Sequence, residues 1–425
     1  MGLKGYVRYI TIALVMMSLV YTALVPGGTT RASASSSKEW PHVNAGSLYV
    51  MDMASGRPLY WEAPDKRMKP ASTTKIMTAI LAIEKGRMDD MVVVSKRAAS
   101  VEGSRIYLEE GEKESLRDLL YALMLESAND AAIAIAEHLG GSVESFAQMM
   151  NEKAASLGCT GTHFTNPNGL EDPDHYTTAH DLALIARYAM QNPQFRQVVS
   201  TREWQMPWPV KNSTRVLYNE NRLLWSEDGT GVKTGYTTAA GHCMVASAKR
   251  GGQEVLVVLL GGEMGFWKDI RELIDYYFAR YVTLTVVQKG QELGTRKFSS
   301  WGFSHEVKAV AGEDAVLPVC TEEKGATAQV RVAWKEGVRP PISAGDTLGI
   351  AYISFPTLPS AAEICIPVVA AEAVPGLVLS RLPWKWTLAF CGVLALLSSA
   401  RSAARRKRRL RKRYLKPRRP RIRRL

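Results

Sequence analysis

The sequence is poor in residues that hold metal ions or build disulfide frameworks. Its 425 residues include five cysteines, with no Cys-x-x-Cys pair and no zinc-site spacing. There is no His-Glu-x-x-His motif, and His175 and His180 are five residues apart, a poor spacing for one helical face. Cys320 and Cys365 could pair in an oxidising compartment, but burial as small apolar side chains is the interpretation we favour for all five. The cysteines are Cys159, Cys243, Cys320, Cys365 and Cys391. The sequence therefore predicts no metal site.

A basic surface is also missing from the body of the chain, although the net charge is +13. Residues 401–425 hold fifteen of the 54 Lys and Arg residues and no acid, and residues 1–34 hold three more. Residues 35–400 are left with 36 basic and 41 acidic residues, a net charge of −5. The basic excess thus belongs to the chain ends, and we expect no nucleic acid partner for the body. A tail that binds nucleic acid stays an alternative, which export of the body would disfavour.

Two uncharged, mostly apolar runs lie near the two ends of the chain, and the first is typical of a secretory signal. The composition, 46% hydrophobic and 22% charged, excludes a mainly disordered chain and a polytopic membrane protein. Lys4 and Arg8 precede the uncharged run 9–25, and Ala32-Ser33-Ala34 has the small-x-small form of a cleavage site. We interpret residues 1–34 as a signal peptide, with an uncleaved anchor as the alternative.

The second run, near the C-terminus, predicts a membrane anchor at residues 384–404. Residues 386–400 carry no charge, and Trp384, Lys385 and Trp386 are suited to a membrane interface. The basic tail 405–425 follows at once, which favours a cytoplasmic tail, contact with membrane lipid and an extracytoplasmic body. A helix lying on the outer leaflet is the alternative.

Hydrophobic periodicity between the two ends predicts one α/β domain and a small β-rich region. Strands are expected at 47–53, 57–61, 232–236, 242–250 and 254–260, and helices at 73–85, 116–125, 131–139, 146–157, 179–190 and 269–281. Strands at both sequence ends with helices between them indicate a domain over residues 38–283. Residues 285–370 show short β-rich runs broken by Gly and Pro.

The start of the helix at 73–85 carries a candidate nucleophile. Ser72 and Lys75 are three residues apart and would face the same side of a helix. A lysine whose pKa is lowered by burial or by a positive neighbour can take the proton of a serine hydroxyl. The helix N-terminus adds N–H groups close to a forming oxyanion. Taken alone, the Pro-Ala-Ser-Thr-Thr-Lys segment also fits an ordinary helix cap.

Two further motifs offer polar groups suited to the same chemistry. Ser127-Ala128-Asn129 lies between two helical runs, where a hydroxyl could relay protons and an amide could orient a lysine or a substrate. Lys233-Thr234-Gly235 lies on a predicted strand, where a cation and a hydroxyl suit a carboxylate and glycine allows close backbone approach. Each motif alone also fits a plain structural interpretation, as a helix-linking turn or an exposed strand lysine.

The order Ser-x-x-Lys, Ser-x-Asn, Lys-Thr-Gly is much more specific than any one motif. With it the sequence resembles the penicillin-binding serine enzymes, and more narrowly the low-molecular-mass D-alanyl-D-alanine carboxypeptidases of bacteria. The stretches that match this family are 69–78, 126–132, 164–170, 175–181 and 231–237. The likeness is close over residues 38–283 and looser over the β-rich region and the anchor.

The resemblance implies a fold of the penicillin-binding and serine β-lactamase type. This is an α/β (α+β) domain with an antiparallel sheet flanked by helices, followed by a small all-β domain and a C-terminal membrane helix. It implies a peptidoglycan stem peptide as substrate, β-lactams as covalent inhibitors, and no organic cofactor or metal.

The resemblance also assigns roles to individual residues. Ser72 would be the nucleophile, Lys75 its general base and Ser127 the proton carrier. The substrate would be held by Asn129, Lys233, Thr234, Gly235 and Tyr236, and the backbone N–H groups of Ser72 and Tyr236 would form the oxyanion hole.

The sequence alone leaves several alternatives open. A serine β-lactamase would need a Glu-x-x-Leu-Asn segment, and Glu220-Asn221-Arg222-Leu223-Leu224 lacks the final Asn. A D,D-endopeptidase acting on peptidoglycan crosslinks would use the same residues. A non-catalytic penicillin-binding scaffold would have no need of an intact nucleophile. A Ser-His-Asp set with His175 or His180 and Asp181 explains less of the chain than the lysine-containing set.

Overall fold

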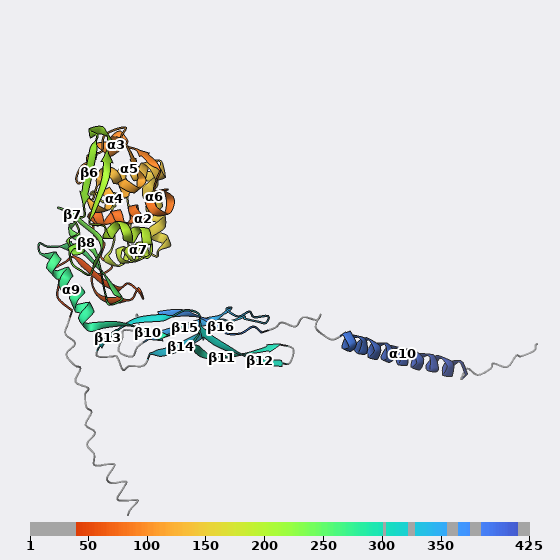
Figure 1. Cartoon of the computed structure of the whole chain (residues 1–425). Coiled ribbons are helices and arrows are strands. Elements are labelled where there is room, and N and C mark those ends of the chain that lie inside the picture. Colours follow the sequence, from red (N-terminus) through yellow and green to blue (C-terminus); the bar gives the residue numbers. More distant parts are fainter. Residues whose placement is uncertain (1–39, 301–302, 322–327, 355–363, 375–383, 415–425) are drawn as a thin grey trace, which may run out of the picture. The chain divides into compact units, whose positions relative to one another are not determined.

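A five-stranded antiparallel sheet organises the α/β domain in the structure, a computed structural model (Figure 1). The structure describes residues 40–300, 303–321, 328–354, 364–374 and 384–414, so the predicted signal peptide and residues 415–425 of the tail lie outside it. The strand order is β2-β1-β9-β8-β7. The strands are β1 (Ser47–Asp52), β2 (Pro58–Glu62), β7 (Gly229–Thr237), β8 (Gly241–Arg250) and β9 (Gln253–Gly262).

The sheet is covered on both faces. Residues 254–260 of β9 are buried without a break, which is typical of a strand with packed layers on either side. One layer is α9 (Phe266–Arg280), which contacts β8 and β9 and buries Ile270, Leu273 and Ile274. Most other helices gather on the opposite face (Figure 1). They are α2 (Lys75–Lys85), α4 (Leu116–Leu125), α5 (Asn129–Gly140), α6 (Val143–Ser156), α7 (Ala179–Gln191) and α8 (Pro193–Ser200).

The predicted strands and main helices of this domain are confirmed, with shifted ends. The helix expected at 269–281 starts at Phe266 and ends at Arg280, because Tyr281 already begins strand β10. The prediction lacked α8, the short pair β3 (Met91–Val93) and β4 (Lys113–Ser115), and the hairpin of β5 (Glu203–Trp208) and β6 (Ser213–Tyr218). Pro207 and Pro209 interrupt the hairpin's alternating pattern, which hides it from a periodicity search.

A second hydrophobic core lies in the β-rich region. The strands there form a pair, β10-β13, and a five-stranded sheet of order β11-β12-β16-β15-β14. Their bounds are β10 (Tyr281–Val287), β11 (Glu292–Ser300), β12 (Phe303–Ala311), β13 (Ala315–Cys320), β14 (Gln329–Trp334), β15 (Thr347–Ser354) and β16 (Ile364–Ala370). This core includes Leu317, Ile353 and Val368 and is separate from the core around α2. The two cores support our proposed division into domains at 38–283 and 285–370, although β10 crosses that boundary.

The prediction that all five cysteines are buried is confirmed for two of them and wrong for the other three. Cys159 and Cys243 are buried and Cys320 is half-buried, but Cys365 and Cys391 are exposed, and all five are free thiols. Cys365 lies on β16 opposite Tyr352 of β15. Side chains alternate across a strand, so Cys365 faces outward while its neighbour Ile366 enters the core.

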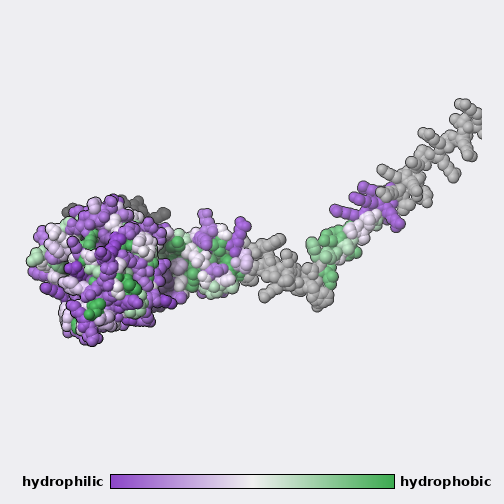
Figure 2. Space-filling view, turned by 90° about the horizontal axis from the view of Figure 1, so that it is seen from above, coloured by the Kyte–Doolittle hydropathy of each residue, from purple (hydrophilic) through white to green (hydrophobic). Residues whose placement is uncertain are grey.

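The C-terminal helix is longer than the predicted anchor. Helix α10 (Trp384–Tyr414) runs ten residues past 404, so the first part of the basic tail is helical. Figure 2 shows hydrophobic residues on its first half and hydrophilic residues on its second. Residues Leu388–Arg408 are long and apolar enough to cross a membrane by length and composition.

Candidate active site

Ser72 lies on a short, constrained turn that leads into α2. The turn is the 3-10 helix η1 (Ala71–Thr74). Ala71 has φ +48°, in the left-handed region that side chains other than glycine rarely adopt. A Cβ on Gly169 would lie 1.8 Å from the Ala71 carbonyl oxygen, so that glycine permits the 166–170 loop to press against the turn. The position of the half-buried Ser72 is therefore restricted by the backbone of Ala71 and by the packing of the 166–170 loop.

Lys75, the first residue of α2, is fully buried and makes three hydrogen bonds. Its Nζ lies 3.0 Å from Ser72 Oγ, 2.8 Å from Asn129 Oδ1 and 2.6 Å from the carbonyl oxygen of Asn168. Asn129 Nδ2 donates to the Glu102 carbonyl at 2.7 Å, which fixes the orientation of the amide with Oδ1 toward Lys75.

These partners suit a neutral amine whose lone pair faces Ser72. Burial and the nearby Lys233 ammonium lower the pKa of Lys75 well below its ordinary value, and Glu220 and Asp130 offset part of this. Asn129 Oδ1 and the Asn168 carbonyl can only accept, so they take the two N–H bonds of a neutral amine. The remaining lone pair can then accept the Ser72 proton. The geometry is therefore suited to general-base chemistry by a lysine.

The loop with Ser127 joins α4 to α5 and is held by its neighbours. Ser127 is buried and has φ +58°. Asn129 begins α5, and its N–H donates to the Ser104 carbonyl at 2.7 Å. Asp130 accepts backbone N–H groups from Ile106 and Leu108, and burial raises its pKa. The 104–108 segment and the Ser127 loop are thus tied together beside Lys75.

Strand β7 brings the third motif against the η1 turn that holds Ser72. A Cβ on Gly235 would lie 2.8 Å from the backbone nitrogen of Ser72, so glycine is required for this approach. Lys233 is buried, and burial lowers its pKa while Glu220 and Glu126 raise it. Thr234 is half-buried, and Tyr236 is 59% exposed with its ring 4.8 Å from that of His242. Strand β7 therefore brings one buried cation and a half-buried hydroxyl close to η1.

The structure thus assembles all three motifs around Ser72. Hydrogen bonds join Ser72, Lys75 and Asn129, close packing joins Gly235 to Ser72, and charge couples Lys233 to Lys75.

Two contacts were missed from the sequence. The Asn168 carbonyl binds Lys75, although no individual role was predicted for its Asn-Pro-Asn-Gly segment. Glu220 Oε2 lies 3.9 Å from Lys233 Nζ. The turn chemistry of the first and the acidic residue of the second were visible, but neither signal points to a lysine far away in sequence.

His175 supports the turn and has a different set of partners from a Ser-His-Asp triad. Its Nε2 lies 2.9 Å from Thr74 Oγ1, and its Nδ1 accepts from the Thr165 N–H at 3.1 Å. Burial lowers the pKa of His175 to about 4, so it is neutral at pH 7. Asp181 instead accepts hydrogen bonds from Gly161 N–H and the Thr162 hydroxyl.

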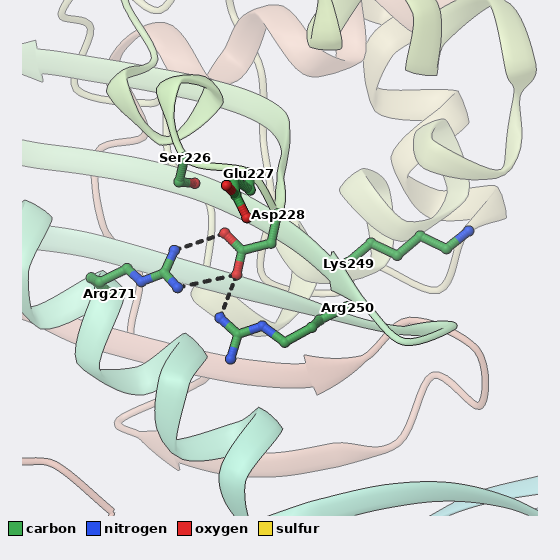
Figure 3. Close-up of a pocket in the computed structure, with 6 residues that line it drawn as sticks. All are labelled: Ser226, Glu227, Asp228, Lys249, Arg250 and Arg271. Carbon is green, nitrogen blue, oxygen red and sulfur yellow. Dashed lines mark hydrogen bonds and ion pairs between the residues drawn. The ribbon is translucent and has the colours of Figure 1, made fainter.

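A separate charged pocket of about 640 Å³ has its arginines committed to ion pairs (Figure 3). Arg271 binds both carboxylate oxygens of Asp228 at 2.7 and 3.1 Å, and Arg250 reaches Asp228 at 2.6 Å. Both arginines also bind Asp275. Figure 3 shows Lys249 directed away from these groups. We call the ion pairs of Asp228 and Asp275 with Arg250 and Arg271 the Asp228 cluster. The cluster ties the residue before β7 to β8 and α9.

Comparisons with known proteins point to one family of enzymes. The family described as D-alanyl-D-alanine carboxypeptidase matches residues 33–264. The chain is 30% identical over 344 residues to the D-alanyl-D-alanine carboxypeptidase DacF of Bacillus subtilis, covering 79% of this chain and 87% of the relative. It is 36% identical over 247 residues to DacB2 of Mycobacterium tuberculosis, covering 56% and 84%.

Solved structures give the same result. The crystal structure of penicillin binding protein 5 from Haemophilus influenzae has a TM-score of 0.69 at 26% identity, covering 79% of this chain and 99% of that one. That of DacD from Francisella tularensis has a TM-score of 0.62 at 26% identity, covering 80% and 95%.

Proposed function

Because the chain belongs to the D-alanyl-D-alanine carboxypeptidase family, we propose that Ser72, Lys75 and the groups around them carry out the reaction of that family. The chain is accordingly a serine-type hydrolase that acts on peptidoglycan peptides and releases the terminal D-alanine.

In the acylation step Ser72 Oγ attacks the carbonyl of the penultimate D-alanine. Its proton passes to the neutral amine of Lys75, 3.0 Å away. The new bond is Oγ–C, and the bond that breaks is the peptide C–N bond to the terminal D-alanine. Ser127 carries a proton to that leaving nitrogen. Water then attacks the acyl-enzyme and releases the shortened peptide.

The remaining residues bind and orient the substrate. The Lys233 ammonium and the Thr234 hydroxyl hold the terminal carboxylate. Asn129 fixes Lys75 and contacts the substrate amide, while Gly235 leaves room for the backbone. The N–H groups of Ser72 and Tyr236 stabilise the oxyanion, a role supported by the close approach of β7 to Ser72.

The observation that carries this assignment is the fully buried Lys75 beside Ser72, with two acceptors occupying its N–H bonds. The test is intact-mass analysis after adding benzylpenicillin, with Ser72→Ala as control and D-alanine release from a pentapeptide measured in parallel. A penicilloyl adduct absent from the control, together with D-alanine release, is the expected result. An adduct without release would favour an endopeptidase or a non-catalytic penicillin-binding scaffold. Without any adduct on folded protein, the residue assignment fails.

We also propose that residues 1–34 are removed on export and that α10 holds the enzyme in the cell membrane. The first half of α10, in which Lys385 is the only charged residue, and its basic second half support a span with the body outside and the basic tail inside. Truncation before residue 384 should release the enzyme from the membrane fraction. A tag at the C-terminus should resist protease added to intact spheroplasts, whereas a helix lying on the outer leaflet would leave it accessible.

A further inference from the structure

Glu220 is an acidic residue placed at the active site by a rigid turn. It lies between β6 and η3 (Arg222–Trp225), flanked by the buried Asn219 and Asn221. The side chain of Asn219 accepts from the Asn221 N–H at 2.9 Å, and that of Asn221 accepts from the Leu223 N–H at 3.0 Å. The turn therefore leaves the backbone of Glu220 little freedom.

The same turn is tied to the Ser127 loop. The Glu220 N–H donates to the carbonyl of Leu125, the last residue of α4, at 3.2 Å. Glu126 Oε1 accepts from the Tyr218 N–H at 2.7 Å. Glu220 is consequently fixed between the loop of the second motif and the strand of the third.

From this position Glu220 reaches Lys233. Its Oε2 lies 3.9 Å from Lys233 Nζ, and the two side chains are 47% and 1% exposed. The other charged groups that act on Lys75 or Lys233 are engaged elsewhere, Glu126 with Tyr218 and Asp130 with backbone N–H groups. Glu220 is thus the partly exposed acid that lies beside the buried Lys233.

We propose that Glu220 is a positioning residue for the reaction, which holds the Lys233 ammonium in place and yields it to the terminal carboxylate of the substrate. This rests on the proposed role of Lys233. Its distance from Lys233 allows an ion pair, and its exposure allows the carboxylate to turn into solvent when substrate arrives. A negative group at this place also disfavours a second substrate anion there.

The negative charge of Glu220 favours the protonated form of both lysines. Glu220 raises the pKa of Lys233 and that of Lys75. Activity needs Lys233 protonated, which sets the alkaline limb of the pH profile, and Lys75 neutral, which sets the acid limb. Loss of the Glu220 charge lowers both pKa values, so both limbs move to lower pH. Damage to packing would lower the whole profile without moving it.

The experiment compares the full chain in detergent with its Glu220→Gln variant. The readout is the second-order rate constant of acylation by benzylpenicillin across pH, together with KM and kcat for D-alanine release. We expect each limb to move to lower pH by about half a unit, less than for a fully desolvated pair because Glu220 is half-exposed. At a pH where Lys233 stays protonated, KM should fall and kcat should change little, because the competing carboxylate is gone.

Two further variants serve as controls. Glu220→Asp keeps the charge and should restore most of the wild-type profile. Glu227→Gln removes the same charge from an exposed residue of the pocket in Figure 3 and should leave the profile unchanged. Coincident profiles of the folded Glu220→Gln variant and the wild type overturn the proposal. A wild-type enzyme without a Ser72 adduct overturns the proposed function instead, so the two failures are distinguishable.

Discussion

Replacing Lys75 with methionine tests the proton chemistry at the centre of the site. Methionine has a similar length, cannot accept the Ser72 proton, and leaves the acceptors Asn129 Oδ1 and the Asn168 carbonyl without their donor. General-base catalysis contributes roughly 10²–10⁴ in rate, or about 3–5 kcal/mol of the activation barrier. We therefore expect acylation by benzylpenicillin to slow by at least about 10²-fold.

The same variant also tests how the burial of Lys75 makes the free energy of unfolding depend on pH. Because the pKa of Lys75 is lowered in the folded protein, the unfolded state binds more protons between that value and 10.5. The contribution of Lys75 to the free energy of unfolding is unfavourable below this window and disappears above it. The wild type should therefore gain stability relative to Lys75→Met as pH rises from 7 to 10. Urea denaturation of both proteins across this range measures the difference.

Lys69→Arg is the matched control for these measurements. Lys69 precedes the nucleophile turn, and its Nζ donates to the Asp172 carbonyl at 2.6 Å, a bond that arginine can also make. We expect its acylation rate to stay within a few-fold of the wild type. Acylation of Lys75→Met within tenfold of the wild type would refute the assigned role of Lys75, since Ser72 would then have another base.

Three other perturbations act on described contacts. In Gly235→Ala the new Cβ would lie 2.8 Å from the Ser72 backbone nitrogen, so β7 must move. The acylation rate should fall roughly 10²-fold with little change in Tm. An unchanged rate would exclude the close approach of β7 to Ser72. His175 is neutral in the folded state, and its pKa is about 4 instead of 6.5. Between pH 7 and 4 the free energy of unfolding should therefore fall by about 3 kcal/mol more in the wild type than in His175→Gln. An equal fall in both proteins would contradict the burial of a neutral His175 ring. Asp228→Asn removes the charged acceptor shared by Arg250 and Arg271. In urea denaturation the free energy of unfolding should fall by about 2 kcal/mol, less than for a fully buried ion pair because both arginines are partly exposed. A difference that vanishes in high salt would show that the cluster contributes only as surface ion pairs.

Much of the catalytic domain could be predicted because its signals are local. The apolar spacing of α2 and the uninterrupted apolar run of β9 each predict a buried element from its own residues alone. The three motifs were located on a helix start, a loop between helices and a strand, and the structure has them there. Their convergence came from the family resemblance, since no local pattern brings β7 to η1.

The parts that could not be predicted depend on tertiary contacts of backbone and charge. The Asn168 carbonyl is a backbone group that every residue type carries, so nothing in the sequence marks it as a partner of Lys75. Glu220 was weighed only against a β-lactamase segment, because its nearness to Lys233 arises from the path of the chain between β6 and β7. Exposure of Cys365 depends on which face of β16 meets the core, and a one-residue change of register would reverse it.

The left-handed backbone at Ala71 and Ser127 has a consequence for selection in the laboratory. At each residue this conformation costs about 1 kcal/mol, whereas glycine adopts it freely. A screen for thermal tolerance alone would thus be drawn toward glycine at these two places. Glycine at residue 71 would also loosen the backbone that aims the Ser72 hydroxyl, and glycine at residue 127 would remove the proposed proton carrier itself, so hardier variants found there should be slower enzymes. Stability and catalytic rate are therefore expected to oppose each other at the residue that precedes the proposed nucleophile and at the proposed proton carrier.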